Sequence, residues 1–139
     1  MRLALDTNIV MDVFLEREPH HEVAEQLFAA VERGWCEGLI CATSVTTIYC
    51  LTEKLRSSRE AHNQVRRLLS LFRIAPVNAL VLSEAIKLEF QDFEDAVVCQ
   101  SAQTAGADGI VTRDPKGFRR SSIPVFDPAN ALAMVHQQD

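Results

Sequence analysis

The stretch LALDTNIVMDVFL at residues 3–15 changes character at Asp6, where an apolar run meets a carboxylate. Residues 3–5 are typical of a buried strand, and the apolar positions after Thr7 predict a helix over residues 8–15 with Thr7 as its N-cap. An acid directly after an apolar strand destabilises a fold unless it has a use. Asp6 is therefore a candidate functional residue at the carboxyl end of a strand.

The rest of the chain alternates between short apolar runs and amphipathic segments. Further strands are predicted at 39–42, 74–76, 109–111 and near Val125. Helices are predicted between Pro19 and Gly34, from Thr43 or Ser44 to Leu55, over about 59–72, from about Asn78 to Phe90, from Asp92 to Gly106 and from Pro128 to about His136. Because helices separate the strands without a hairpin signal, the strands are expected to be parallel, with helices on both faces. We predict one α/β domain over residues 1–139, with three α/β/α layers around a mostly parallel sheet of about four to five strands.

The composition excludes several classes of protein. With 139 residues, 47% apolar and 24% charged, the chain can bury a core and is unlike disordered, collagen-like or coiled-coil sequences. No uncharged apolar run has the roughly 18 residues that span a bilayer, and Asp6 interrupts any secretory signal, so we expect a cytoplasmic protein without a membrane segment. Cys36, Cys41, Cys50 and Cys99 form no C-x-x-C pair and are expected to be reduced and buried.

The formal charge of −5 is unevenly distributed. Residues 54–73 carry a local charge of +5 and residues 113–120 a local charge of +3, so the remainder is strongly acidic. Two basic segments on an acidic body are compatible with a phosphate-binding surface beside a metal site, although a solvated helix face and a basic loop would explain them more simply. The candidate contacts to an RNA backbone are Arg56, Arg59, Arg66, Arg67, Arg113 and Lys116.

Four carboxylates from separate stretches are expected to meet at one edge of the sheet, because ligands of open parallel sheets bind beyond the carboxyl ends of the strands. Asp6 and Asp114 follow predicted strands, and Asp92 and Asp95 occupy the first turn of a helix. The other polar residues just past strands are Ser44 and Thr112. Crowded carboxylates repel one another unless a cation neutralises them, and oxygen-only ligands fit Mg²⁺ or Mn²⁺. Such an ion suits phosphodiester hydrolysis.

Each acid also has a simpler interpretation. Asp92 and Asp95 suit the positive end of a helix dipole or its cap, and Asp114 before Pro115 suits a turn. Glu94 and Asp12 are expected to be solvated. No P-loop, dinucleotide-binding, nucleophile-elbow or H-E-x-x-H motif occurs in the chain.

These residues resemble a known family. LALDTNIVMDVFL at 3–15 resembles the opening of PIN-domain ribonucleases, and DAVVCQSAQTAGADGIVTRDPKGF at 95–118 resembles their closing signature. IPVFDPANAL at 123–132 resembles the last strand and helix of the family, so the likeness covers nearly the whole chain. Small single-domain members are often VapC-type toxins of toxin–antitoxin pairs, whereas the DFEDA wording at 92–96 resembles a less characterised branch.

The resemblance implies roles by position. Asp6, Asp95 and Asp114 would be the catalytic carboxylates that hold Mg²⁺ or Mn²⁺, with Asp92 as a further ligand through water. The supporting polar residues would be Asn8, Ser44 and Thr112. The implied activity is metal-dependent endoribonuclease, and the implied partners are RNA, a small antitoxin protein and a second copy of the chain.

One departure from the family pattern leaves alternatives open. The family commonly places a Glu early in the helix after the second strand, where this chain has Thr46 and Thr47, and its first acid there is Glu53. Either Asp92 or Glu94 compensates, the site holds one metal weakly, or catalysis has decayed. In the last case the chain would be an RNA- or protein-binding module. A HAD-type phosphatase is a weaker rival, because Asn8 stands where that class has a second Asp.

Overall fold

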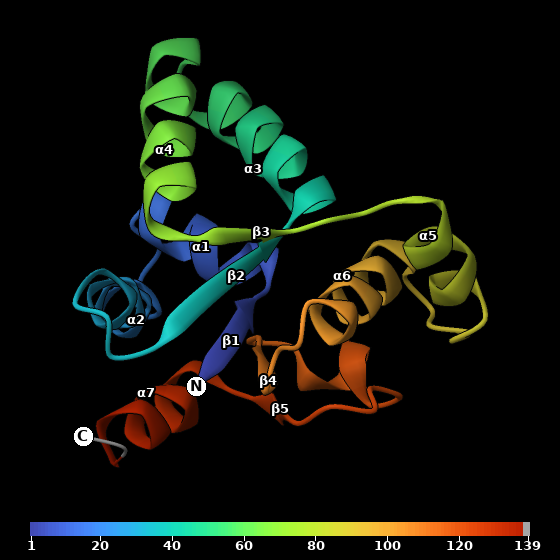
Figure 1. Cartoon of the computed structure of the whole chain (residues 1–139). Helices are drawn as coiled ribbons and strands as arrows, with labels where there is room; N and C mark the ends of the chain where they lie inside the picture. The colour runs from blue at the N-terminus through green and yellow to red at the C-terminus, as the bar shows by residue number, and fades with distance from the viewer. Residues whose placement is uncertain (138–139) are drawn as a thin grey trace.

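The computed structural model describes residues 1–137 and contains a five-stranded, entirely parallel sheet (Figure 1). Its strands lie in the order β3-β2-β1-β4-β5. Their bounds are β1 Arg2–Leu5, β2 Glu37–Cys41, β3 Arg73–Ala75, β4 Gly109–Val111 and β5 Val125–Phe126. The predicted α/β class and parallel sheet are confirmed.

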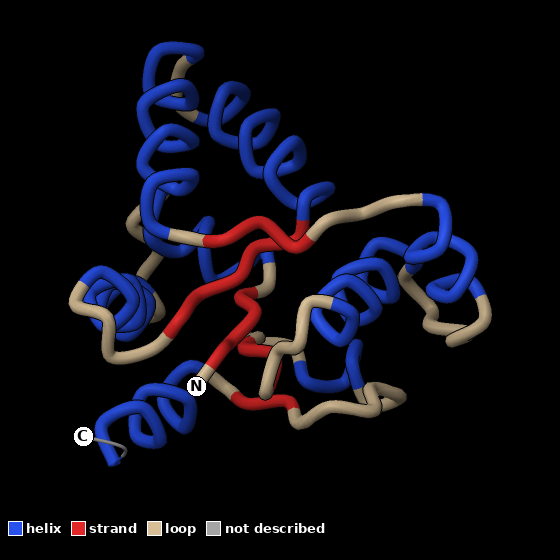
Figure 2. The backbone as a smooth tube through the Cα atoms, viewed as in Figure 1, coloured by secondary structure: helices blue, strands red, loops and turns tan. Residues whose placement is uncertain are grey.

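Helices cover both faces of the sheet (Figure 2). They are α1 Thr7–Phe14, α2 His21–Glu32, α3 Ala42–Leu55, α4 Ser58–Leu71, α5 Ala79–Ile86, α6 Phe93–Thr104, the short 3-10 helix η1 Pro115–Phe118 and α7 Pro128–Gln137. None of the helices within residues 1–137 is long and apolar enough to cross a membrane.

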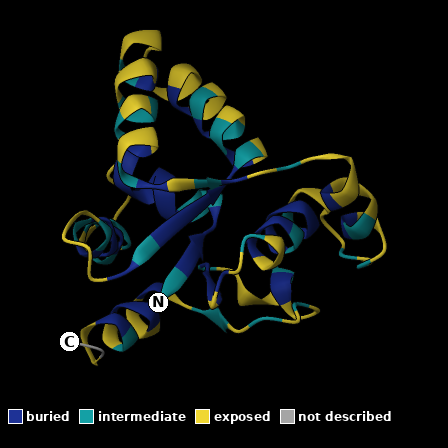
Figure 3. Ribbon diagram, in the orientation of Figure 1, coloured by how far each residue is buried: buried dark blue, intermediate teal, exposed yellow. Residues whose placement is uncertain are grey.

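Two apolar cores lie on opposite faces of the sheet because successive strand side chains alternate in direction. Leu3 and Leu5 of β1 pack with residues of α1, α2, α4 and α7, whereas Ala4 packs with residues of α5 and α6. The strands are buried between these layers and the outer helix faces are exposed (Figure 3). This is the predicted three-layer arrangement.

Several details differ from the sequence prediction. Asp6, not Thr7, is the N-cap of α1, and α3 begins at Ala42 after Cys41 rather than at a Thr43 or Ser44 cap. Helix α5 ends at Ile86, short of the expected Phe90. Cys50 is exposed on α3, while the other three cysteines are buried as expected, and all four are free thiols.

The position of β1 in the middle of the sheet determines where the strand-end residues meet. Strand β1 pairs with β4, and the backbone N–H of Asp6 donates to the carbonyl of Val111 at 2.9 Å. The carboxyl ends of β1 and β4 therefore lie side by side. Asp6 and Thr112, which follow these two strands, are brought to the same edge.

Candidate metal centre

Asp6 is held at the end of β1 by three hydrogen bonds. Its Oδ1 accepts from the backbone N–H of Thr7 at 2.8 Å, and its Oδ2 accepts from Thr112 Oγ1 at 2.8 Å and Asn8 Nδ2 at 3.3 Å. Burial raises the pKa of Asp6, the bonds from Thr112 and Thr7 lower it in part, and the charges of Glu94 and Asp114 raise it further. The carboxylate is thus oriented but costly to ionise.

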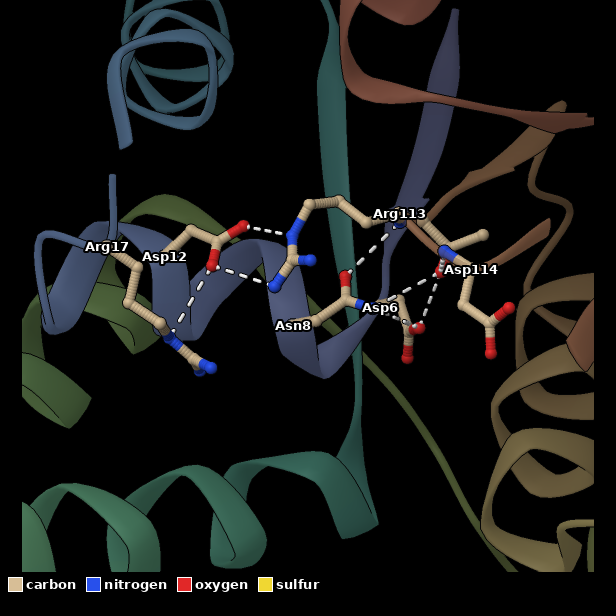
Figure 4. Close-up of polar contacts among 7 residues, drawn as sticks. Asp6, Asn8, Asp12, Arg17, Arg113 and Asp114 are labelled. Atoms are coloured by element: carbon tan, nitrogen blue, oxygen red, sulfur yellow. Dashed lines mark hydrogen bonds and ion pairs between the residues drawn. The ribbon is translucent and has the colours of Figure 1, made fainter. Parts of the chain in front are cut away.

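Thr112 joins the two strand ends through one buried hydroxyl. Its Oγ1 donates to Asp6 and accepts from the backbone N–H of Asp114 at 3.0 Å and from Asn8 Nδ2 at 3.4 Å. The amide oxygen of Asn8 in turn accepts from the backbone N–H of Arg113 at 3.4 Å (Figure 4). Asn8 and Thr112, both expected to support the acids, therefore contact Asp6 directly.

The first turn of α6 contributes three carboxylates. Asp92 is the N-cap, and its Oδ1 accepts from the backbone N–H groups of Glu94 at 2.8 Å and Asp95 at 3.4 Å, so the capping interpretation of Asp92 is confirmed. The pKa of Asp95 is raised to about 7, first by burial and then by the charges of Asp6, Asp92, Glu94 and Asp114. The carboxylate of Asp95 is therefore repelled by the charges of the other four acids.

Asp95 and Asp114 approach each other across Gly117. A β-carbon placed at Gly117 would lie 3.0 Å from Asp95 Oδ2 and 3.3 Å from Asp114 Oδ2. We refer to the five mutually repelling acids as the acidic cluster: Asp6, Asp92, Glu94, Asp95 and Asp114.

The donor chemistry of the acidic cluster fits a hard divalent cation. It offers carboxylate oxygens only. The pKa of Asp95 is raised by burial and then by the neighbouring acids, and a bound cation would relieve the repulsion among them. Within residues 1–137, no three His, Cys, Asp or Glu side chains are already arranged to surround one metal ion. The fit to Mg²⁺ or Mn²⁺ thus rests on charge and ligand type.

Two hollows share Asp92 and Asp95. The first has a volume of about 300 Å³ and brings Asp6, Asn8 and Glu94 together with Thr47 and Leu51 of α3. The second, of about 310 Å³, lies beside Asp114 and η1. Thus the acids that were predicted from separate stretches border one continuous region of the surface.

Helix α3 presents no acid to this region. Thr47 and Leu51 line the first hollow, while Glu53 is exposed and lines neither hollow. Glu94 was expected to be merely solvated; it is exposed, but it also lines the first hollow and raises the pKa of Asp6. The carboxylates of the first hollow are therefore supplied by β1 and α6 and not by α3.

Asp12 is the residue that the sequence interpretation placed wrongly. It is completely buried, and its carboxylate accepts two hydrogen bonds from Arg113, at 2.6 and 3.1 Å, with Arg17 at 3.5 Å (Figure 4). The signal was available, because every other residue of 9–14 is apolar and a helix that is apolar all round is buried. An acid in such a helix needs a buried partner.

The basic candidates are dispersed. The guanidinium of Arg113 is engaged by Asp12, and its role as a phosphate contact stays a prediction. Arg56 donates to the carbonyl of Leu15, and Arg67 pairs with Glu25 at 3.6 Å, whereas Arg59 and Arg66 are exposed on α4. Of the six candidates, Lys116 alone lines one of the two hollows described above.

Ser44 does not join the acids either. It is completely buried in the first turn of α3, lines neither hollow, and its hydroxyl has no hydrogen-bond partner within residues 1–137.

Comparisons with known proteins agree with this architecture. Ribonuclease VapC1 of Aquifex aeolicus is 24% identical over 130 residues, which cover 90% of this chain and 89% of the relative. VapBC2 from Rickettsia felis, solved with a promoter DNA fragment, superposes with a TM-score of 0.69 at 15% identity, covering 91% of this chain and 98% of that one. A toxin–antitoxin complex from Klebsiella pneumoniae gives 0.68 at 24% identity, covering 91% and 97%. The sequence model of the PIN domain matches residues 2–116, and the chain therefore belongs to the PIN domain family.

Proposed function

We propose that this chain is a divalent-metal-dependent endoribonuclease that hydrolyses RNA phosphodiester bonds. The observation that carries the proposal is the acidic cluster, which brings together acids from the end of β1, the start of α6 and the loop after β4. Burial, together with repulsion from the other acids, raises the pKa of Asp95 there to about 7. The likeness to a ribonuclease over 90% of the chain supports the same activity.

The resemblance to the family supports the following roles. Asp6, Asp95 and Asp114 would hold Mg²⁺ or Mn²⁺, with Asp92 reached through water. When bound, such a cation polarises a phosphoryl oxygen and offsets the charge that develops during hydrolysis. Thr112 and the Thr7 amide keep both oxygens of Asp6 oriented, and Asn8 links Asp6 to the loop that carries Asp114.

The activity is tested by incubating end-labelled RNA with wild-type protein, Asp6→Asn and the control Asp108→Asn, with Mn²⁺ or with EDTA. Asp108 is an exposed acid directly before β4, at the end of the strand opposite to the acidic cluster, where its carboxylate accepts a hydrogen bond from the backbone N–H of Arg2. We expect cutting by the wild type and Asp108→Asn in Mn²⁺ only, and at least a hundredfold less by Asp6→Asn. Equal cutting by all three, or cutting in EDTA, would contradict the mechanism.

A second candidate follows from α3, which faces the cluster with Thr47 and Leu51 instead of an acid. In that case the chain would be a catalytically weak or inactive PIN domain that binds RNA or a protein. Calorimetric titration with Mn²⁺ separates the two: saturable binding that Asp95→Asn abolishes favours the nuclease. RNA binding that persists without metal, together with no cutting, favours the binding module.

We further propose that the chain acts as the toxin of a toxin–antitoxin pair, with a small antitoxin protein and a second copy of the chain as partners. The similarity to toxin–antitoxin complexes supports this role. Expression of the chain alone is expected to slow growth, and co-expression of a small neighbouring reading frame to restore it. Light scattering of the purified chain is expected to give the mass of a dimer. Unimpaired growth would count against the toxin role, and a monomer mass would count against the dimer.

A further inference from the structure

The second hollow is lined by side chains of both charges. Its lining includes Asp92, Asp95 and Asp114, which we call the acidic wall, and Lys116, Arg119 and Arg120, which we call the basic wall. Both walls are therefore within the dimensions of one pocket of about 310 Å³, which is the lower end of the range, roughly 300–1,000 Å³, in which ligand pockets fall.

The basic wall is built on an anchored turn. Phe118 is buried and packs edge-on against Phe90, with ring centroids 6.1 Å apart, and the backbone N–H of Gly117 donates to the Asp114 carbonyl at 3.2 Å. At the other end, the Asp114 amide is held by Thr112. Asp114 and Lys116 are thus held close to each other by one short segment that is anchored at both ends.

Two of the three side chains of the basic wall form no ion pair. Arg120 pairs with Glu89, which also lines the hollow, at 3.6 Å, whereas Lys116 and Arg119 form no ion pair with any acid of residues 1–137. The contrast is a wider hollow at the opposite edge of the sheet, where Arg2 and Arg73 both pair with Glu37. An anion in the second hollow therefore meets two basic side chains, Lys116 and Arg119, that no ion pair within residues 1–137 engages.

We propose that Lys116 and Arg119 bind a phosphate of the RNA strand adjoining the phosphate that is cleaved. This inference rests on the proposed function, because it needs the scissile phosphate at the acidic wall. A strand lying across the pocket would then set one phosphate against the acids and their cation and the next against the bases. Lysine and arginine bind phosphates without reading sequence, so the contact fixes register rather than base preference.

The first test measures RNA binding separately from cutting. Fluorescence anisotropy of a labelled single-stranded RNA is recorded in EDTA in the Asp6→Asn background, so that the RNA stays uncut and no cation contributes to binding; Asp6 does not line this hollow. Lys116→Ala and Arg119→Ala are expected each to weaken binding roughly three- to tenfold at low salt and to reduce the slope of log affinity against log salt by about 0.7. Arg120→Ala is expected to have a smaller effect, because Glu89 already shares that charge.

The matched control is Arg33→Ala. Arg33 is exposed after α2 and lies over the Trp35 ring at 5.1 Å, outside the second hollow. The Arg33→Ala variant removes the same charge as Lys116→Ala. If both variants lose the same affinity for RNA, the effect is one of general charge, and the proposal is overturned.

The second test locates the phosphate. A series of RNAs is prepared in which one neutral methylphosphonate linkage replaces a different phosphate in each. For protein with Lys116 and Arg119 intact, we expect weaker binding only when the linkage adjoins the cleavage site. For the Lys116→Ala, Arg119→Ala double variant, we expect the position of the linkage to make no difference. Equal sensitivity at all positions, or free nucleoside monophosphate competing as well as RNA, would overturn the strand assignment. Cutting by the wild-type chain with no effect of the basic variants refutes only this inference, whereas normal basic-wall binding without any cutting refutes only the proposed nuclease.

Discussion

Asp95 lies in the first turn of α6 among four other acids, and its raised pKa has a thermodynamic consequence. Folded protein holds the Asp95 proton up to a pH of about 7, whereas the unfolded chain releases it near the ordinary value of 3.8. The folded state therefore binds more protons between these values, and stability falls as the pH rises from about 4 to 7. Without a cation, the ionised cluster opposes folding.

Replacing Asp95 by Asn should consequently stabilise the metal-free protein. In EDTA at pH 8 we expect Asp95→Asn to unfold with a free energy on the order of 1 kcal/mol higher than that of the wild type, a value reduced for partial exposure, and the difference to shrink as the pH falls towards 4. Urea denaturation at pH 8 and pH 5 measures it. Glu53→Gln, an exposed acid on α3 outside the cluster, is the control, and a difference for Asp95→Asn that grows on acidification would contradict the argument.

Substitution of Gly117 tests whether the close approach of Asp95 and Asp114 is needed for metal binding. The methyl group of Gly117→Ala would press on both carboxylates, at 3.0 and 3.3 Å, and is expected to weaken Mn²⁺ binding about ten- to hundredfold with little loss of stability. Gly34→Ala is the opposite control: its site has open space but a φ of +76°, so stability should fall by about 1 kcal/mol while Mn²⁺ affinity stays unchanged. Calorimetry and urea denaturation of both variants separate the two effects.

Among the elements, α1 and the loop after β4 are joined by a buried ion pair. Asp12 of α1 is inaccessible to solvent and accepts both bonds of the Arg113 guanidinium, next to Asp114 in the chain. The pair therefore anchors to the core the loop that carries one of the acids. A buried pair of this kind is destabilising mainly when one partner is removed.

Arg113→Gln should cost about 3 kcal/mol of unfolding free energy, because it leaves the Asp12 charge buried with Arg17 at 3.5 Å. The double variant Asp12→Asn, Arg113→Gln is expected to lose less than the sum of the two single losses. A double-mutant cycle by urea denaturation measures this coupling. Strictly additive losses would show that the two side chains do not stabilise each other.

Element positions were predictable because apolar runs and caps are local signals. The first strand and the helix starting near Asp92 lie within a residue or two of expectation. Thr7 and Asp6 both suit an N-cap, and a local pattern does not choose between them. The apolar neighbours of Asp12 indicate its burial, but its partner Arg113 is 101 residues away in the chain and could not be identified from a local pattern.

The candidate site was predictable to the same extent. Asp6, Asp95 and Asp114 could be singled out because strand ends and helix starts are visible in the sequence, and parallel strands share one edge. Ser44 follows a strand in the same way, but its helix directs it into the core, away from both hollows. The pairing of Arg113 and the exposure of Lys116 depend on tertiary packing, which no local pattern contains.

On the scale of the whole molecule, divalent cations should stabilise the fold specifically. A ligand that binds the folded state alone at a hundred times its Kd adds about 2.7 kcal/mol to the unfolding free energy. Mn²⁺ or Mg²⁺ is expected to raise the melting temperature of the wild type, with no rise for Asp6→Asn. Potassium chloride at equal ionic strength controls for screening of the net charge of −5, and an equal rise with it would refute a specific site.

The central position of β1 has a consequence for synthesis on the ribosome. Asp6 is made long before Asp95 and Asp114, yet β1, which it follows, is paired with β4 in the sheet. A nascent polypeptide cannot assemble the five acids before residue 114 has been translated. Premature termination anywhere earlier therefore leaves a fragment that lacks Asp114 and cannot form the complete acidic cluster.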